Sequence, residues 1–291
     1  MSFFGKKGVG ILSNFKMSNH ALGLSWIAII ALVLAGCAAS EELQQLSAEE
    51  RFKIAMEKFN NEDYFEAIED FKIVTLQFQG GRLADDAQFY IAECYFKREQ
   101  YLLAAYEYEA LTRTMPTSEF VSQSRYRKAL CYFYSSPAPY LDQENTRKAI
   151  DEFQTFIEYH PTDTLVPDAE AKIGELNAKL ARKEFDNGVI YMRMEYYRAA
   201  INSFDHVLEK YYDSPYAEQS QLKKAEAMLY RNRFEEARVE IEKFFVKYPA
   251  SSFKGEAEQL RNSILQKQRS AAPNAATDQS NNPQSQLLRT Q

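Results

Sequence analysis

The fold is decided by the stretch from Asp86 to Pro116, which reads DAQFYIAECYFKREQYLLAAYEYEALTRTMP. It contains two apolar patterns with i, i+3, i+4, i+7 spacing, which is typical of amphipathic helices. A short polar turn, Lys97–Gln100, separates the two patterns, and Pro116 ends the second because proline cannot continue a helix. The stretch therefore predicts two short antiparallel helices. Their apolar positions are Phe89, Ala92, Tyr95 and Phe96 in the first helix, and Tyr101, Ala104, Tyr108 and Leu111 in the second.

The same pattern recurs along the chain, with a small residue at a fixed place in each helix. The small residue of the first helix returns at steps of 37, 37, 59 and 37 residues. Only a small side chain fits where two helices cross closely. Hairpins repeated in this way are typical of tetratricopeptide repeats, whose usual period is about 34 residues. The small residues are Ala55, Ala92, Ala129, Gly188 and Ala225 in the first helices, and Ala67, Ala104, Ala149, Ala200 and Ala237 in the second helices.

We therefore expect an all-α fold, a right-handed superhelix of five tetratricopeptide-type helical hairpins closed by a C-terminal capping helix over Ser252–Lys267. The third hairpin carries an insertion, Tyr134–Thr146, whose two prolines predict a loop. The proline-free run Asp168–Arg193 predicts a long helix that divides the array. The predicted units are repeats one to three at 47–163, repeats four and five with the cap at 164–268, and a disordered tail at 269–291.

The N-terminus has the features of a targeting segment. A basic region ends at Lys16 and is followed by an apolar run, Ala21–Val33, which is short for a membrane span. The run stops at Leu34-Ala35-Gly36-Cys37, which resembles the lipobox of bacterial lipoproteins.

This resemblance implies cleavage before Cys37 and acylation, including palmitate, of that cysteine, because several acyl chains anchor a protein stably where one does not. We expect residues 1–36 to be a lipoprotein signal peptide and residues 37–46 to be a linker after the lipid anchor. An uncleaved anchor with an incidental cysteine is the alternative, and Met17 is a second candidate for the start.

The charge balance argues against a nucleic-acid partner. The chain holds 35 basic and 41 acidic residues, and residues 1–36 contain three of the basic ones and no acid. A product that begins at Cys37 therefore carries 32 basic against 41 acidic residues, a net charge of −9. Binding to phosphate backbones requires clustered Lys and Arg instead.

Residues suited to catalysis or metal binding are scarce. The chain lacks a glycine-rich phosphate loop, a pair of cysteines with metal-ligand spacing and a nucleophile elbow. His160 and His206, the histidines outside the targeting segment, have no evident partner. We expect no metal, no cofactor and no enzymatic activity. Cys94 and Cys131 occupy equivalent places in neighbouring repeats, about 10 Å apart, which predicts buried free thiols and no disulfide.

Aromatic residues recur at two positions that we expect to face a groove, three residues before and four after the small residue of the first helix. Aromatic anchors at such positions are typical of peptide-binding surfaces. The alternative is that the rings pack between adjacent repeats. Lys97, with Arg98, Arg125 and Arg127, could receive a carboxylate, and the alternative is that some of these cations only offset the surrounding acids. The predicted peptide groove is Phe52, Phe59, Phe89, Phe96, Lys97, Tyr126 and Phe133.

The sequence resembles the BamD family of outer-membrane protein assembly lipoproteins. The similarity covers about Ser47 to Lys267 and combines the lipobox, the five repeats and the long helix between repeats three and four. It is carried by the segments FNNEDYFEAIEDF, ADDAQFYIAECYF and YYRAAINSFDHVLEKYYDSPYAEQS.

The resemblance implies a subunit anchored by lipid at the periplasmic face of the outer membrane, rather than at the cell surface. It implies that the N-terminal half binds unfolded outer-membrane β-barrel proteins. It also implies that the C-terminal half docks on a BamA-like barrel insertase, beside other assembly lipoproteins. Two alternatives are a lipoprotein that scaffolds cell-wall or envelope-constriction proteins, and an envelope hydrolase.

Overall fold

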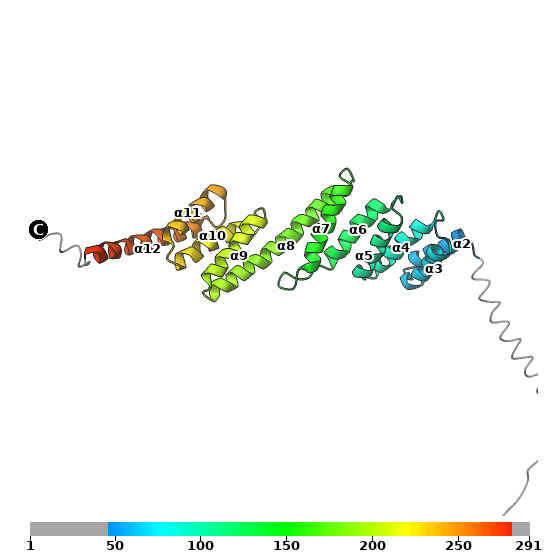
Figure 1. The fold of residues 1–291 in the computed structure, drawn as a ribbon, viewed down its shortest axis with the longest axis horizontal. Coiled ribbons are helices and arrows are strands. Elements are labelled where there is room, and N and C mark those ends of the chain that lie inside the picture. The colour runs from blue at the N-terminus through cyan, green and yellow to red at the C-terminus, as the bar shows by residue number, and fades with distance from the viewer. Residues whose placement is uncertain (1–45, 281–291) are drawn as a thin grey trace, which may run out of the picture.

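The computed structural model describes residues 46–280, which form an extended array of helical hairpins (Figure 1). Eleven helices follow one another, and this part of the chain contains no β-strand. The expected all-α fold of helical hairpins is confirmed. The expected signal peptide, Cys37 and nearly all of the linker lie outside the described residues. The helices are α2 (Ala48–Asn60), α3 (Tyr64–Gln77), α4 (Ala84–Lys97), α5 (Tyr101–Thr114), α6 (Val121–Tyr134), α7 (Glu144–Tyr159), α8 (Val166–Arg193), α9 (Tyr197–Lys210), α10 (Ala217–Tyr230), α11 (Phe234–Lys247) and α12 (Lys254–Ser280).

The small residues identified in the sequence all lie inside the array. The nine alanines are fully buried, and Gly188 is buried in α8. Each second helix also buries a large side chain four residues after its alanine. In the fourth hairpin the fit is closest, because a Cβ atom added to Gly188 would lie 2.5 Å from Cε1 of Phe204. The five large side chains are Phe71, Tyr108, Phe153, Phe204 and Ile241.

Four of the five hairpins turn through the same backbone geometry. The residue seven places after the small residue of the first helix adopts a left-handed conformation, with φ between 57° and 66°. In the second hairpin this residue is Glu99, and the N–H group of Gln100 then donates to the carbonyl of Tyr95 at 2.9 Å. This bond satisfies a carbonyl at the end of α4, as in a Schellman cap. The other left-handed residues are Glu62, Glu195 and Asn232.

Glycine is expected to stabilise this turn. A non-glycine residue in the left-handed region costs about 1–2 kcal/mol, so Glu99→Gly should raise the free energy of unfolding by about 1 kcal/mol, despite the added entropy of the unfolded chain. Urea denaturation followed by circular dichroism measures this change. The matched control is Glu170→Gly within α8, where glycine should lower stability by about 1 kcal/mol. A loss of stability in Glu99→Gly would contradict the turn geometry.

The insertion in the third hairpin is a loop, as predicted, but over residues 135–143 only, because Tyr134 belongs to α6 and Glu144–Thr146 belong to α7. Gln143 is 1% exposed, and its Nε2 donates to the carbonyls of Ala138 at 2.8 Å and Leu141 at 3.0 Å. The loop is also bound to α8, because Lys179 Nζ donates to Ser136 Oγ at 2.8 Å. The insertion therefore braces the long helix against the third hairpin.

The two long helices differ from their predicted lengths. Helix α8 begins at Val166 rather than Asp168, since Pro167 fits the first turn of a helix. Helix α12 buries Ala257 and Ile264, as expected of a cap. It continues to Ser280, however, so the predicted end of this helix at Lys267 is wrong. Alanine, which has the highest helix propensity, recurs in the stretch after Lys267 on both sides of Pro273, where the helix loses one backbone hydrogen bond.

None of the helices in the described part of the chain combines the length and apolar character needed to cross a bilayer.

Candidate peptide-binding surface

Two of the predicted groove residues lie in the interior of the array. Phe89 is 5% exposed, and its ring stacks on Phe120 with 4.6 Å between the ring centroids. Tyr126 is 8% exposed, and its hydroxyl donates to Asp168 on α8. Burial and this hydrogen bond raise the pKa of Tyr126. For Phe89 and Tyr126, packing between adjacent repeats is therefore the correct interpretation.

The remaining four aromatic residues are half-buried, with one part of each ring packed and another part accessible. Phe52 and Phe59 both pack against Tyr90 of the next hairpin, with centroid distances of 6.1 and 5.2 Å. Phe133 packs against Phe153, and Lys172 Nζ lies 4.9 Å from its ring centroid. These rings both stabilise the array and reach its surface.

Phe96 belongs to a cluster of rings at the junction of the second and third hairpins. Its centroid lies 5.4 Å from Tyr101 and 5.8 Å from Tyr134. Tyr101 and Tyr134 stack on each other at 5.4 Å, and Tyr134 remains 52% exposed. Sequence reasoning missed Tyr134 because it assigned this residue to the insertion. The signal that could have found it is Tyr230, which follows Ala225 by the same five residues.

The cations near the predicted groove have partners within the chain. Arg127 Nε lies 3.0 Å from the buried carboxylate of Glu93, and its guanidinium carbon lies 5.1 Å from the Phe96 centroid. Arg125 lies over the ring of Tyr159, with its guanidinium carbon 4.3 Å from the centroid. Lys97 is exposed at the end of α4. Arg98 beside it is exposed as well, with its guanidinium carbon 5.5 Å from the Phe65 ring centroid, so Lys97 and Arg98 are both placed to meet a carboxylate at the surface.

The Glu93 carboxylate also accepts a hydrogen bond from the hydroxyl of Tyr108 at 2.5 Å. Burial, reinforced by this carboxylate, raises the pKa of Tyr108 well above its usual value. Burial likewise raises the pKa of the Cys94 and Cys131 thiols to about 12, so both remain protonated at neutral pH. Both cysteines are free, as predicted.

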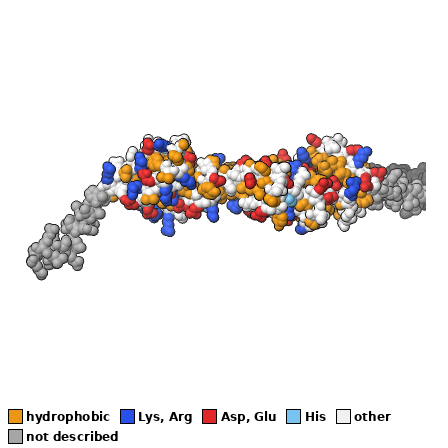
Figure 2. All heavy atoms as spheres, turned by 90° about the horizontal axis from the view of Figure 1, so that it is seen from above, with side chains coloured by type: hydrophobic (Ala, Val, Ile, Leu, Met, Phe, Trp, Pro, Cys, Tyr) orange, Lys and Arg blue, Asp and Glu red, His pale blue; other side chains and the backbone are white. Residues whose placement is uncertain are grey.

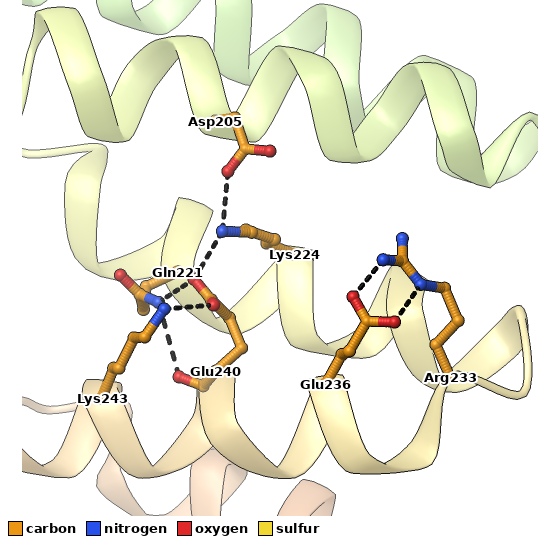
Figure 3. A network of polar contacts seen from close by, with 7 residues as sticks. All are labelled: Asp205, Gln221, Lys224, Arg233, Glu236, Glu240 and Lys243. Atoms are coloured by element: carbon orange, nitrogen blue, oxygen red, sulfur yellow. Dashed lines mark hydrogen bonds and ion pairs between the residues drawn. The ribbon is translucent and has the colours of Figure 1, made fainter.

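A second buried polar network joins the fourth and fifth hairpins (Figure 3). Lys224 Nζ lies 2.7 Å from Asp205 on α9 and 2.7 Å from Glu240 on α11. Gln221 Nε2 donates to Glu240 at 2.5 Å, and Lys243 lies 3.1 Å from the same carboxylate. Burial alone would raise the pKa of Glu240, but the hydrogen bonds from Lys224 and Lys243 outweigh it and lower this pKa.

The network has a counterpart 96 residues earlier in the chain. Lys128 lies 3.3 Å from Glu109 on α5 and 2.7 Å from Glu152 on α7. In both places a lysine directly before the small residue of a first helix joins two second helices. Each lysine therefore ties one hairpin to the next.

Removal of the central cation should destabilise the protein. We expect Lys224→Met to lower the free energy of unfolding by about 3 kcal/mol, because it leaves Asp205 and the buried Glu240 without a shared partner. Chemical denaturation at pH 7 measures the loss. Lys148→Met, which removes a surface pair with Glu144, is the control and should leave the unfolding midpoint unchanged.

The loss of stability expected in Lys224→Met can be distinguished from a packing effect by its dependence on pH. The stability supplied by Glu240 is complete above its ordinary pKa of 4.5 and is lost as the pH falls through the lowered native value. Wild-type protein should lose this contribution in acid, and Lys224→Met should lose much less. An equal acid loss in both proteins would contradict the network.

Groups suited to chemistry are not gathered at any point of residues 46–280. No cluster of three or more His, Cys, Asp or Glu side chains there could hold a metal ion. His206 lies 3.7 Å from Glu184 at the surface, and the ring of His160 packs near Phe156. On the face shown in Figure 2, cationic and anionic side chains are interspersed with apolar ones.

Comparison with known protein families shows to which family the chain belongs. Residues 44–216 match the family described as YfiO, outer membrane lipoprotein, which is more than half of the chain. The chain belongs to the YfiO family. The matched region begins just before the first hairpin and ends just before α10. The chain therefore combines membership of a family of outer membrane lipoproteins with a fold of stacked helical hairpins.

Similarity to individual proteins is much weaker. No curated protein matches the YfiO-family chain in sequence. The chain is similar to the TPR2AB domain of yeast Sti1 in its pHSP90 complex, with 15% identity and a TM-score of 0.38 over 75% of this chain and 98% of that one. It is also similar to a tetratricopeptide repeat protein from Parabacteroides merdae, with 15% identity and a TM-score of 0.33 over 81% and 80% of the two chains.

Proposed function

We propose that this YfiO-family protein is a lipid-anchored subunit of the outer-membrane β-barrel assembly machinery. In this role it binds unfolded outer-membrane proteins and couples them to a BamA-like insertase. The observation that carries the proposal is the family match, which spans the first four hairpins. The resemblance to BamD noted in the sequence supports it. Acylated Cys37 would hold the protein at the periplasmic face of the outer membrane, and the chain acts as an adaptor rather than an enzyme.

The N-terminal half is the proposed substrate side. Repeats one to three, residues 47–163, carry the partly accessible rings of Phe59, Phe96 and Phe133 and the exposed ring of Tyr134. Unfolded β-barrel segments alternate apolar and polar side chains and expose aromatic residues at the membrane interface. Such segments can place apolar side chains against these rings.

The C-terminal half is the proposed docking side for the insertase. Residues 164–268 begin with α8, which is braced by the insertion loop and tied to the following hairpins. A long helix held in this way would transmit the position of the docked insertase to the substrate side. Other assembly lipoproteins are further candidate partners.

Affinity purification of the native lipoprotein from cross-linked outer membranes tests this proposal. We expect a BamA-like protein and unfolded β-barrel proteins among the captured partners. Recovery of cell-wall hydrolases or envelope-constriction proteins without a BamA-like protein would overturn it in favour of the scaffold alternative. Cys37→Ser, which removes the thiol that would be acylated, should leave residues 1–36 uncleaved and prevent delivery to the outer membrane.

A variant of one surface ring tests substrate binding separately from docking on the BamA-like insertase. Phe133→Ser should lower the yield of unfolded β-barrel proteins several-fold while the BamA-like partner is retained, because the ring lies on the substrate side. Phe65→Ser is the matched control, since Phe65 is exposed on the second helix α3 instead. Equal capture of unfolded substrates by both variants would contradict the assignment of the substrate surface.

A further inference from the structure

One edge of the array exposes more apolar side chains than the other. Because successive helices run antiparallel, the turns within hairpins share one edge, which we call the turn edge, and the connections between hairpins lie at the opposite edge. In Figure 1 the loop between α6 and α7 lies at the lower edge, and the connection between α7 and α8 lies at the upper edge. In the first three hairpins, two large apolar side chains are exposed at the opposite edge, Leu76 and Tyr159, against six at the turn edge. The six are Phe65, Leu102, Leu103, Tyr134, Tyr140 and Leu141.

The first two hairpins differ from the others at one position of this edge. The residue two places before the second-helix alanine is Phe65 in the first hairpin and Leu102 in the second, and both are more than half exposed. In the second hairpin, the exposed side chains of Leu103 and Tyr106 extend the same face of α5, since residues three and four apart are neighbours on a helix. In the other three hairpins the equivalent residue is charged. These residues are Arg147, Arg198 and Glu235.

In the third hairpin the insertion loop supplies the apolar side chains of the turn edge. Tyr140 is 82% exposed and Leu141 is 48% exposed. The backbone that carries them is held from two sides, because the carbonyl of Leu141 accepts from Gln143 Nε2 at 3.0 Å and from Lys183 Nζ at 2.5 Å. The loop therefore presents Tyr140 and Leu141 to solvent at a fixed place, and the apolar edge continues across three hairpins.

We infer that the turn edge of the first three hairpins rests on the surface of the lipid bilayer in which the protein is anchored. The inference deepens the proposed function and rests on its acylated Cys37. Tyrosine rings are enriched at membrane–water interfaces, where the apolar ring and the polar hydroxyl meet matching surroundings. Leucine and phenylalanine side chains enter the boundary between headgroups and acyl chains in the same way on interfacial helices.

The position of the anchor identifies the bilayer as the surface that covers this edge. Residues 37–46 separate Cys37 from the first hairpin, and ten residues of any chain reach at most about 35 Å. Helix α2 has 13 residues and is therefore about 20 Å long, and it ends at the turn edge. The tether thus lets the turn edge touch the bilayer and prevents the first hairpins from moving far from it. Tethering gives the bilayer a high effective concentration at this edge, which a freely diffusing partner lacks.

Charge does not favour the contact. Lys97 and Arg98 are exposed at the turn edge, and Arg98 lies over the ring of Phe65. Glu62 and Glu99, the left-handed residues of the first two turns, are exposed beside them and offset their charge. Burial of apolar side chains therefore carries the contact, so salt, which screens exposed charges, should not release it.

The test uses the native acylated protein in vesicles of phosphatidylethanolamine and phosphatidylglycerol, with an environment-sensitive fluorophore on one introduced cysteine. Cys94 and Cys131 are buried and remain protonated at neutral pH, so they do not compete for the label. Labels on Leu102→Cys and Tyr140→Cys should be quenched by lipids with brominated acyl chains several-fold more than a label on Leu76→Cys. Leu76 is the matched control, because it is 69% exposed at the opposite edge of the first hairpin. High salt should leave the difference unchanged.

Three results would overturn the inference. The first is equal quenching at all three positions, and the second is the absence of quenching at both turn-edge positions. The third is quenching at the turn edge only after a BamA-like partner is added, which would assign this edge to a contact with protein.

Mass spectrometry of the mature N-terminus distinguishes failure of this inference from failure of the proposed anchor. If Cys37 is acylated and the turn-edge labels stay in water, the inference is wrong and the anchor stands. If the mature protein carries no acyl chain, the anchor is wrong and the inference falls with it.

Discussion

The structure depends on the close approach of two helices within each hairpin, which is possible only where one residue of each helix is small. Nine alanines and one glycine hold these places, and the alanines are fully buried. The gap that they leave is filled by a large side chain of the second helix, such as Phe204 against Gly188. Since each hairpin buries only part of its apolar surface, the next hairpin must stack on it. The extended array in Figure 1 follows from this repeated contact.

Contacts between hairpins are of two kinds, and they divide the molecule. Lys128 and Lys224 bridge acids of successive second helices at two equivalent junctions. The junction between the third and fourth hairpins is built differently, by the long helix α8 and the insertion loop that Gln143 holds. Lysine bridges therefore tie the second hairpin to the third and the fourth to the fifth, while the first hairpin packs on the second through aromatic rings. The proposed division between a substrate side and a partner side falls at helix α8.

Much of the fold could be predicted from the sequence, because the small residues must recur in a fixed register whatever surrounds them. The prediction of which aromatic residues reach the surface was less accurate. Phe89 and Phe96 share the same apolar spacing, yet Phe89 is buried under the next hairpin and Phe96 reaches the surface. Periodicity within one helix does not reveal how the next hairpin leans against it. For the same reason, neither the burial of the Glu93 carboxylate nor the exposure of the Tyr134 ring could be predicted from the sequence.

The measurement that tests the central contact most directly is the free energy of unfolding of Gly188→Ala. Helix propensity alone predicts that alanine stabilises α8 by about 1 kcal/mol. Because the added Cβ would meet the Phe204 ring at 2.5 Å, we predict instead a loss of about 1–3 kcal/mol. The loss should be largely recovered in the double variant Gly188→Ala/Phe204→Leu. A Gly188→Ala protein more stable than wild type would contradict the account.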